Sequence, residues 1–213
     1  MIFEDRHDAG ARLAEALAGV AGGDAVVLGI PRGGVVVADE VATRLHLPVD
    51  VVVPRKIGAP GNPELGLGAV APGVRVLDDR MIRRLGVTQE YLDGEVAAQE
   101  REIVRRLERY RGGRPAADVT GRTAVVVDDG VATGGTAIAA LRWARSAGAA
   151  RVVLAVPVAP RATVDRLRRD ADDVVALFTP EPFHAVGEWY RRFTQTTDEE
   201  VVAALARDGR RAS

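Results

Sequence analysis

The stretch that decides the fold is residues 123–136, which read TAVVVDDGVATGGT. Apolar residues suited to a buried strand precede two acids, Asp128 and Asp129, and a turn rich in glycine and threonine then leads into a helical pattern. Glycines let a backbone approach a ligand closely, and the free N–H groups at a helix N-terminus bind anions. The stretch therefore predicts a phosphate-binding turn, with two carboxylates beside it that could accept hydrogen bonds from vicinal hydroxyls or help hold a divalent cation.

The same alternation of strand and helix runs through much of the chain. Nearly continuous apolar runs, typical of parallel strands covered on both faces, occur at 25–30, 49–53, 123–127, 151–156 and 174–178. Helices are expected at 6–18, 34–45, 136–147 and 161–171. A capping box at 197–200 opens a last helix that ends near Arg207. The pattern predicts an α/β fold with a parallel central sheet.

Two segments break this alternation. Residues 58–73 hold too many glycines and prolines for a regular element and are expected to form a long loop, which a hairpin could tie down. Residues 88–111 have apolar side chains at helical spacing and predict a long amphipathic helix. We expect a single domain over 1–213, with a helical insertion at about 78–122 and a C-terminal segment at about 178–213.

Composition bounds the function. The net charge of -1 offers no basic surplus for nucleic acid. The absence of cysteine excludes disulfides, thiolate metal sites and a cysteine nucleophile. Apolar runs are far shorter than a bilayer span and no signal peptide is visible, so we expect a cytoplasmic protein without nucleic-acid or membrane partners.

Two further turns carry basic residues after expected strands. Residues 31–34 read PRGG, and Arg55 and Lys56 end the second apolar run. Lys56 is the only lysine among 29 basic residues, which indicates that this position requires an amine and not a guanidinium. The plainer interpretations are a tight turn with a solvated Arg32 and a surface loop with solvated basic side chains.

Residues 123–136 resemble the ribose-5-phosphate motif of the type I phosphoribosyltransferases. In that motif four apolar residues precede two acids, and a Thr-Gly-x-Thr/Ser ending closes the loop, as Ala124–Val127, Asp128, Asp129 and Thr133–Thr136 do here. The PRGG turn, the basic pair and the long helix are most similar to an uncharacterised bacterial branch known as "predicted phosphoribosyltransferases". The resemblance covers residues 25 to about 157 and implies a type I phosphoribosyltransferase-like (Rossmann-like) parallel sheet flanked by helices, with a small C-terminal hood.

This resemblance implies a transferase (a pentosyltransferase) that uses 5-phosphoribosyl-1-pyrophosphate (PRPP) and Mg²⁺. It would move the 5-phosphoribosyl group to a nitrogenous base and release pyrophosphate, as in nucleotide salvage. The implied 5-phosphate loop consists of Gly130, Val131, Ala132, Thr133, Gly134, Gly135 and Thr136. The implied pyrophosphate site consists of Arg32, Gly33 and Gly34, and the implied catalytic residues are Lys56, Arg55, Asp128 and Asp129. Mg²⁺ would be held mainly through PRPP, with Asp128 or Asp129 as the available carboxylates.

The resemblance implies further features. A non-proline cis peptide is expected around Arg32-Gly33, a mobile loop after Lys56 would close over the site, and the protein would form a homo-oligomer, a dimer. More than half of the aromatic residues lie between 178 and 193. Among them Phe183 is the candidate for stacking on the base, whereas Trp189 and Phe193 are expected to form a small core beneath the hood.

Two other functions compete with this one. Some relatives sense PRPP without turnover, and a PRPP-binding regulator is the alternative because the acceptor side is poorly specified. No helix-turn-helix pattern supports that alternative. A sugar-phosphate hydrolase or phosphatase would need a nucleophile or metal-ligand set, and His7, His46 and His184 lack metal-ligand spacing. The acids at 78–79 imitate the paired acids but are expected to form a turn or a helix cap.

Overall fold

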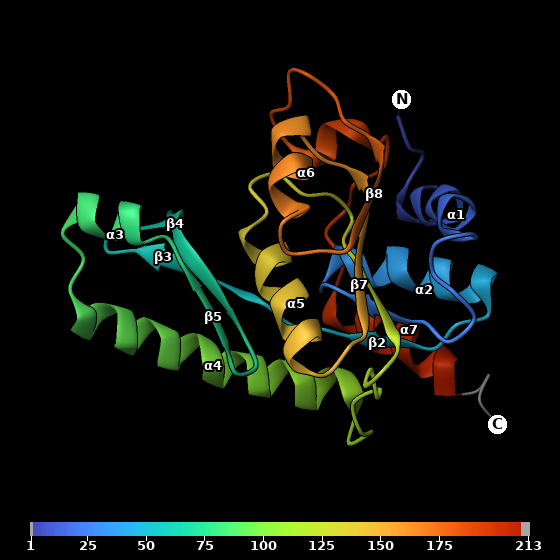
Figure 1. Ribbon diagram of the computed structural model, residues 1–213, viewed down its shortest axis with the longest axis horizontal. Helices are drawn as coiled ribbons and strands as arrows, with labels where there is room; N and C mark the ends of the chain where they lie inside the picture. Colours follow the sequence, from blue (N-terminus) through green and yellow to red (C-terminus); the bar gives the residue numbers. More distant parts are fainter. Residues whose placement is uncertain (1, 210–213) are drawn as a thin grey trace.

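The computed structural model describes residues 2–209 and centres on a five-stranded sheet in the order β2-β1-β6-β7-β8 (Figure 1). Its strands are Val26–Gly29 (β1), Val49–Val51 (β2), Thr123–Val127 (β6), Arg151–Val158 (β7) and Asp173–Phe178 (β8). Every pair in this sheet is parallel, which confirms the predicted α/β class. Each of the five apolar runs supplies one strand.

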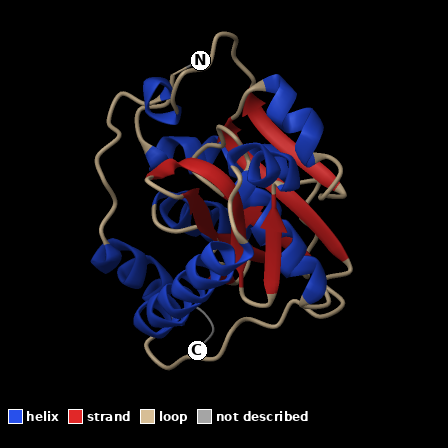
Figure 2. Ribbon diagram, turned by 90° about the vertical axis from the view of Figure 1, so that its left-hand side faces the viewer, coloured by secondary structure: helices blue, strands red, loops and turns tan. Residues whose placement is uncertain are grey.

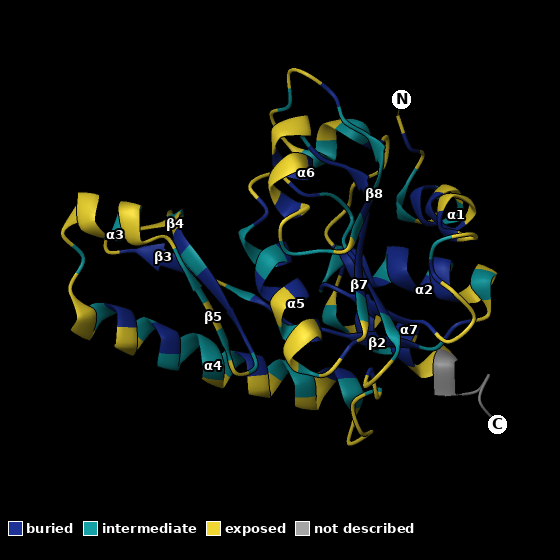
Figure 3. Ribbon diagram, in the orientation of Figure 1, coloured by how far each residue is buried: buried dark blue, intermediate teal, exposed yellow. Residues whose placement is uncertain are grey.

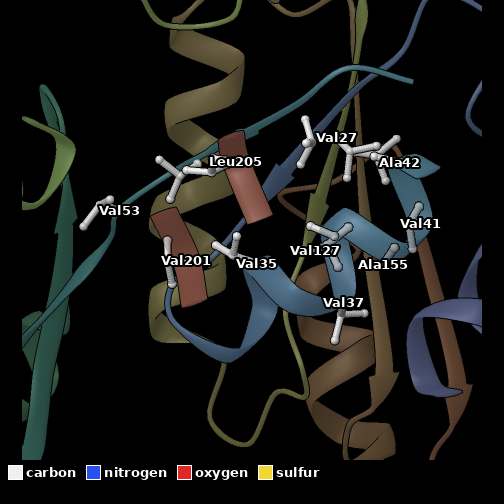
Figure 4. Close-up of a cluster of buried hydrophobic side chains, with 14 of the residues drawn as sticks. Val27, Val35, Val37, Val41, Ala42, Val53, Val127, Ala155, Val201 and Leu205 are labelled. Carbon is white, nitrogen blue, oxygen red and sulfur yellow. The ribbon is translucent and has the colours of Figure 1, made fainter. Parts of the chain in front are cut away.

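Helices cover both faces of this sheet (Figure 2). They are Arg6–Leu17 (α1), Gly33–Leu45 (α2), Gly135–Ser146 (α5), Arg161–Leu167 (α6) and Asp198–Gly209 (α7). Alternate strand residues point to opposite faces: Val27 packs with α1 and α2, whereas Leu28 packs with α5 and α6. α7 covers α2 in turn, so that Val201 and Leu205 meet Val35 in one buried cluster (Figure 4).

Three helix ends test the sequence patterns. The capping box opens α7 as predicted, because the Thr197 N–H donates to the Glu200 carboxylate (2.7 Å) and the Glu200 N–H donates to the Thr197 hydroxyl (3.2 Å). α6 is shorter than predicted, since turns follow Leu167 and the N–H of Asp170 donates to the Leu167 carbonyl (3.0 Å). Asp78 caps Asp79–Leu85 (α3), as expected for a helix cap.

The segment predicted as a long loop is instead an antiparallel sheet. Its strands are Arg55–Ala59 (β3), Asn62–Ala71 (β4) and Val74–Leu77 (β5). The glycines serve close strand approach rather than disorder: a Cβ on Gly58 would lie 2.7 Å from the Pro63 backbone, where the register shifts, and one on Gly68 would strike the Val76 carbonyl. The expected hairpin is present as β3 and β4, but the long loop is not, because the prediction counted glycines without their strand partners.

β3 to β5 and the following helices form an arm that projects from the central sheet (Figure 1). The long helix Gln89–Arg111 (α4) confirms the predicted helix; Thr88 caps it and Gly112 ends it in the left-handed conformation. Its buried face carries Leu92, Val96, Ile103 and Tyr110, and its other face is exposed (Figure 3). A short 3₁₀ helix, Val186–Trp189 (η1), lies in the C-terminal segment. None of the helices in residues 2–209 could span a bilayer.

Candidate functional site

The turns after β1 and β6 pack directly against each other. Gly29 and Val127 are partners in the parallel ladder, and the Ile30 N–H donates to the Val127 carbonyl (2.8 Å). A Cβ on Gly34 would lie 2.8 Å from the Asp128 Cα, which leaves no room for a side chain. The glycines of the PRGG turn therefore let two turns distant in sequence form one surface at the carboxyl edge of the sheet, where open α/β sheets bind ligands.

This surface borders a cavity of about 540 Å³. The cavity unites residues that the sequence singled out separately: Arg32, Gly33, Arg55, Lys56, Asp128, Asp129 and Thr136. A second cavity, also of about 540 Å³, shares Lys56 and Thr136 with the first and continues along Thr133 and Gly135 to Arg166 of α6. The two cavities therefore meet where the phosphate-type turn faces the arm.

The turn from Gly130 to Thr136 is held from outside. Gly134 adopts the left-handed conformation (φ 76°) and precedes α5 without a side-chain cap, so the first N–H groups of α5 lack intrahelical partners. The Thr163 hydroxyl of α6 donates to the Ala132 carbonyl (2.7 Å). A side chain on Gly130 would strike Val186 of η1. These contacts pre-form a turn of the kind that binds phosphate.

The two acids after β6 have perturbed pKa values. Burial raises the pKa of Asp128 well above its usual value, and the neighbouring carboxylate of Asp129 raises it further. Burial also raises the pKa of Asp129, while the Arg6 guanidinium opposes that rise. The Asp129 N–H donates to Asp128 Oδ1 (2.9 Å), and the Tyr190 hydroxyl donates to the Asp129 carbonyl (2.5 Å). Acids with perturbed pKa values that line a cavity are typical of ligand sites.

The basic residues are held less tightly. Arg55 donates through Nε to Gln99 of α4 (2.8 Å), and burial lowers the pKa of Arg55. The Lys56 ammonium donates to the Glu64 carbonyl and lies 3.6 Å from the Glu64 carboxylate, with 42% of its side chain exposed. Arg32 lies 3.9 Å from Asp198 at the start of α7. The arm thus supplies one partly buried cation, Arg55, and one exposed cation, Lys56.

A non-proline cis peptide is present in the PRGG turn, but between Pro31 and Arg32. The expectation placed it around Arg32-Gly33, one bond later.

The aromatic residues of the C-terminal segment divide into two groups. Phe183 stacks with Trp189 at 6.4 Å between ring centroids, and Trp189 meets Phe178 edge-on at 5.1 Å. Phe183, the sequence candidate for base stacking, is not among the residues that line either cavity. Phe193, expected in the small core, lines the first cavity instead and is 38% exposed.

Sequence reasoning missed three contributors to the cavities. Arg6 reaches Asp129 from the start of α1, residues 194–196 form one wall, and Arg166 lies beside Gly134. No local pattern marks any of them, because only tertiary packing brings them to the sheet edge. Residues 2–209 hold no group of three or more histidine, aspartate or glutamate side chains arranged for a metal ion.

Comparisons with known proteins agree with this geometry. A family model described as the phosphoribosyl transferase domain matches residues 3–188. Two proteins from strains of Mycobacterium tuberculosis, each provisionally named a phosphoribosyl transferase, are 53% identical to this chain over 207 residues. The match covers 97% of this chain and 47% of each relative, so the chain spans about half the length of the curated relatives it matches.

Solved structures are similar too. The crystal structure of TT1426 from Thermus thermophilus has a TM-score of 0.83 at 52% identity and covers 97% of this chain and 99% of that one. The AQ2163 protein from Aquifex aeolicus, at 14% identity, has a TM-score of 0.52 over 85% of this chain and 78% of that one, a likeness of fold alone. By the extent of the family match, this chain belongs to the phosphoribosyl transferase domain family.

Proposed function

We propose that this protein is a phosphoribosyltransferase that binds PRPP with Mg²⁺ and transfers the 5-phosphoribosyl group to a nitrogenous base, releasing pyrophosphate. The single observation that carries the proposal is the meeting of the two turns. An acid pair and a phosphate-type turn after β6 lie against a glycine turn with a cation after β1. Such an arrangement suits a sugar that carries a phosphate at one end and a diphosphate at the other.

In this proposal the residues 130–136 bind the 5-phosphate through main-chain N–H groups and the hydroxyls of Thr133 and Thr136. Arg166 lines the same cavity and adds a positive charge there. Asp128 and Asp129 accept hydrogen bonds from the ribose 2- and 3-hydroxyls. Gly33 and Gly34 present main-chain N–H groups to the diphosphate. These contacts fix the ribose by groups remote from C1, so binding energy serves to orient the reacting carbon.

The reaction breaks the C1–O bond to pyrophosphate and forms a C1–N bond to the base, whose nitrogen loses its proton. Pyrophosphate departs ahead of attack, so positive charge develops on the ribose ring and negative charge on the leaving oxygens. Arg32, Arg55 and Lys56 would stabilise the leaving group. When bound, Mg²⁺ supplies a further positive charge to the diphosphate oxygens. The carboxylates of Asp128 and Asp129 line the first cavity and are the oxygen donors that would hold such a cation.

One observation favours a second candidate function, a regulator that binds PRPP without turnover. Phe183 packs away from the cavities, and the guanidinium of Arg6 covers the ring of Phe193 at 4.0 Å. No bare aromatic face is therefore evident among the described residues that line the first cavity. The role in nucleotide salvage, the cytoplasmic location and the dimer remain predictions.

A screen of nitrogenous bases with PRPP and Mg²⁺ tests the proposal by measuring pyrophosphate release. We expect release with at least one base, and none from a variant that carries both Asp128→Asn and Asp129→Asn. Calorimetry of PRPP binding runs in parallel. Tight binding without release across the panel would favour the regulator, and no binding of PRPP would remove both candidates.

A further inference from the structure

Arg6 joins four parts of the chain at the edge of the first cavity. It is the first residue of α1, which Asp5 caps by accepting from the N–H groups of His7 (3.0 Å) and Asp8 (3.1 Å). The cap fixes the main chain at the point where the side chain turns inward. Only 11% of the Arg6 side chain is exposed, which is unusual for an arginine unless it is paired.

Three contacts fix the guanidinium of Arg6. Its Nε donates to Asp129 Oδ2 at 2.8 Å, and its Nη1 donates to the Thr194 carbonyl at 2.8 Å. Its plane covers the ring of Phe193, with 4.0 Å between the guanidinium carbon and the ring centroid. A planar, fork-shaped guanidinium can donate to an acid and a carbonyl while its flat face stacks on an aromatic ring, whereas a lysine ammonium has no flat face to stack.

These contacts leave little freedom to Asp129. Arg6 holds one carboxylate oxygen of Asp129, which points the other oxygen to a fixed place. The pyrophosphate-type turn closes the third side: a Cβ on Gly33 would strike Asp129 Oδ2 and would lie 2.6 Å from Arg6 Nε. The second acid is therefore set by its neighbours from α1, α2 and the C-terminal segment.

We propose that Arg6 is a positioning residue that orients Asp129 for the ribose hydroxyls and couples that orientation to the cavity wall at residues 193–194. The inference rests on the proposed function, because it assigns Asp129 to the sugar. It goes beyond that function by giving a role to the start of α1, which carries no motif. It also makes the C-terminal wall part of donor binding and not only of acceptor binding.

A double-mutant cycle tests this role by calorimetry of PRPP binding with Mg²⁺. Removal of an outer-shell partner of a binding residue weakens metal sites 10- to 100-fold, and we expect Arg6→Gln to weaken PRPP binding by about that factor. In an Asp129→Asn background the same substitution should change affinity by less than about threefold, because coupled residues are not additive. Arg6→Lys should recover part of the loss, since it keeps the charge but not the fork.

Arg12→Gln is the matched control. Arg12 lies on the same helix, pairs with Asp8 (3.0 Å) and covers the ring of Phe3 at 5.6 Å, but it does not line either cavity. Its loss should leave PRPP affinity within twofold. Binding of inorganic pyrophosphate with Mg²⁺ should persist in Arg6→Gln, which separates a positioning role from a collapsed site.

The outcomes are distinct. Independent, multiplicative losses from Arg6→Gln and Asp129→Asn would overturn the inference, as would unchanged PRPP affinity in Arg6→Gln. If Arg6→Gln does not fold, the cycle with Arg6→Lys decides in the same way. Failure of the unaltered protein to bind PRPP would instead sink the proposed function, before Arg6 is considered.

Discussion

The carboxyl edge of the parallel sheet and the antiparallel arm contribute to the same cavities in opposite ways. At the sheet edge, main chain packs on main chain: Gly33 and Gly34 touch the acids directly, and Thr163 fastens the turn before α5. The arm lines the first cavity with Arg55 and Lys56, and it lines the second with residues of β3, β4 and β5. Lys56 is held there by an exposed pairing with Glu64. The edge is therefore built from packed main chain, whereas the arm presents side chains to the cavities.

The difference indicates a division of labour. A ligand that must be placed accurately is best held by groups that lose little conformational entropy on binding, and the packed turns are such groups. A cation that stabilises negative charge developing on a leaving group can adjust its position if its side chain is flexible, as that of lysine is. We therefore expect changes at the edge to abolish donor binding and changes in the arm to alter turnover. The following experiments test that contrast, in order of falling effect.

The largest effect should come from the acids at the sheet edge. Replacing both Asp128 and Asp129 by asparagine removes the acceptors for the ribose hydroxyls, and we expect PRPP affinity to fall by more than about 100-fold, the cost of two charge-assisted hydrogen bonds. Calorimetry measures it. Unchanged binding would mean that the pair does not hold the sugar.

Turnover should respond most to the arm. Lys56→Ala removes the accessible cation, so kcat should fall much more than PRPP affinity, as expected for a contact made mainly in the transition state. Steady-state kinetics with an active base separates the two quantities. The matched control is Glu64→Gln, which removes an exposed ion pair of Lys56 but keeps the ammonium, and it should change kcat by less than about twofold. Equal losses in kcat and affinity would argue against this role for Lys56.

A smaller loss should follow from Arg166→Gln. This side chain lines the cavity beside Thr133, and a charge-assisted contact at an exposed site predicts a loss of PRPP affinity of about tenfold or less. A diphosphorylated ribose that lacks the 5-phosphate should bind the variant and the unaltered protein alike. Arg169→Gln, just beyond α6, serves as the control. A loss that persists without the 5-phosphate would contradict the assignment.

Without ligand, Asp128 at the sheet edge should make the free energy of unfolding depend on pH. Burial raises the folded-state pKa of Asp128 above its ordinary 3.8, so the folded protein binds more protons than the unfolded chain. The contribution of Asp128 to stability is therefore fully present below its unfolded-state pKa, near the ordinary 3.8, and is lost as pH rises through its folded-state pKa. Urea unfolding of Asp128→Asn and the unaltered protein from pH 4 to pH 8 should show the variant gaining relative stability with pH. A stability difference between the two proteins that does not change with pH would contradict a raised folded-state pKa for Asp128.

The smallest effect should come from the far side of the arm. Gly94 lies within α4, and a Cβ there would meet nothing within 4 Å. Gly94→Ala should therefore raise stability by about 0.5–1 kcal/mol through helix propensity alone. Thermal unfolding measures the gain, and PRPP affinity should not change. A fall in affinity would show that the arm is coupled to the edge more tightly than its contacts indicate.

Much of the edge could be read from sequence, because short-range order built it. Apolar runs with parallel-strand character predicted the central sheet, and the runs that form β1 and β6 are each followed by a turn whose residues line the first cavity. Residues 31–34 and 128–136 lie together because β1 and β6 are neighbouring parallel strands whose turns leave the same edge of the sheet. Residues 55–56 reach the cavities from the first strand of the arm, β3. Local pattern sufficed where the function is built into a single strand-turn-helix unit.

The arm, the role of Arg6 and the placement of the C-terminal aromatic residues could not be predicted from the sequence, because they depend on tertiary contacts between distant segments. Residues 58–73 form strands in which Gly58 and Gly68 are required because the paired strand lies too close for a side chain. Composition alone cannot distinguish such glycines from those of a loop. Arg6 lies 123 residues from its partner Asp129, and no spacing rule links them. Likewise, Phe183 and Phe193 share one aromatic cluster in sequence, yet only the path of the chain after η1 decides which one faces the cavity.

The position of Lys56 has a practical consequence. The chain has no cysteine and no other lysine, and this one side-chain amine stands half-exposed where the two cavities join. Once the more acidic α-amino group is blocked, an amine-reactive dye used well above neutral pH should therefore label Lys56 alone. The natural protein would then report, through fluorescence and without any engineered handle, on each molecule that enters either cavity.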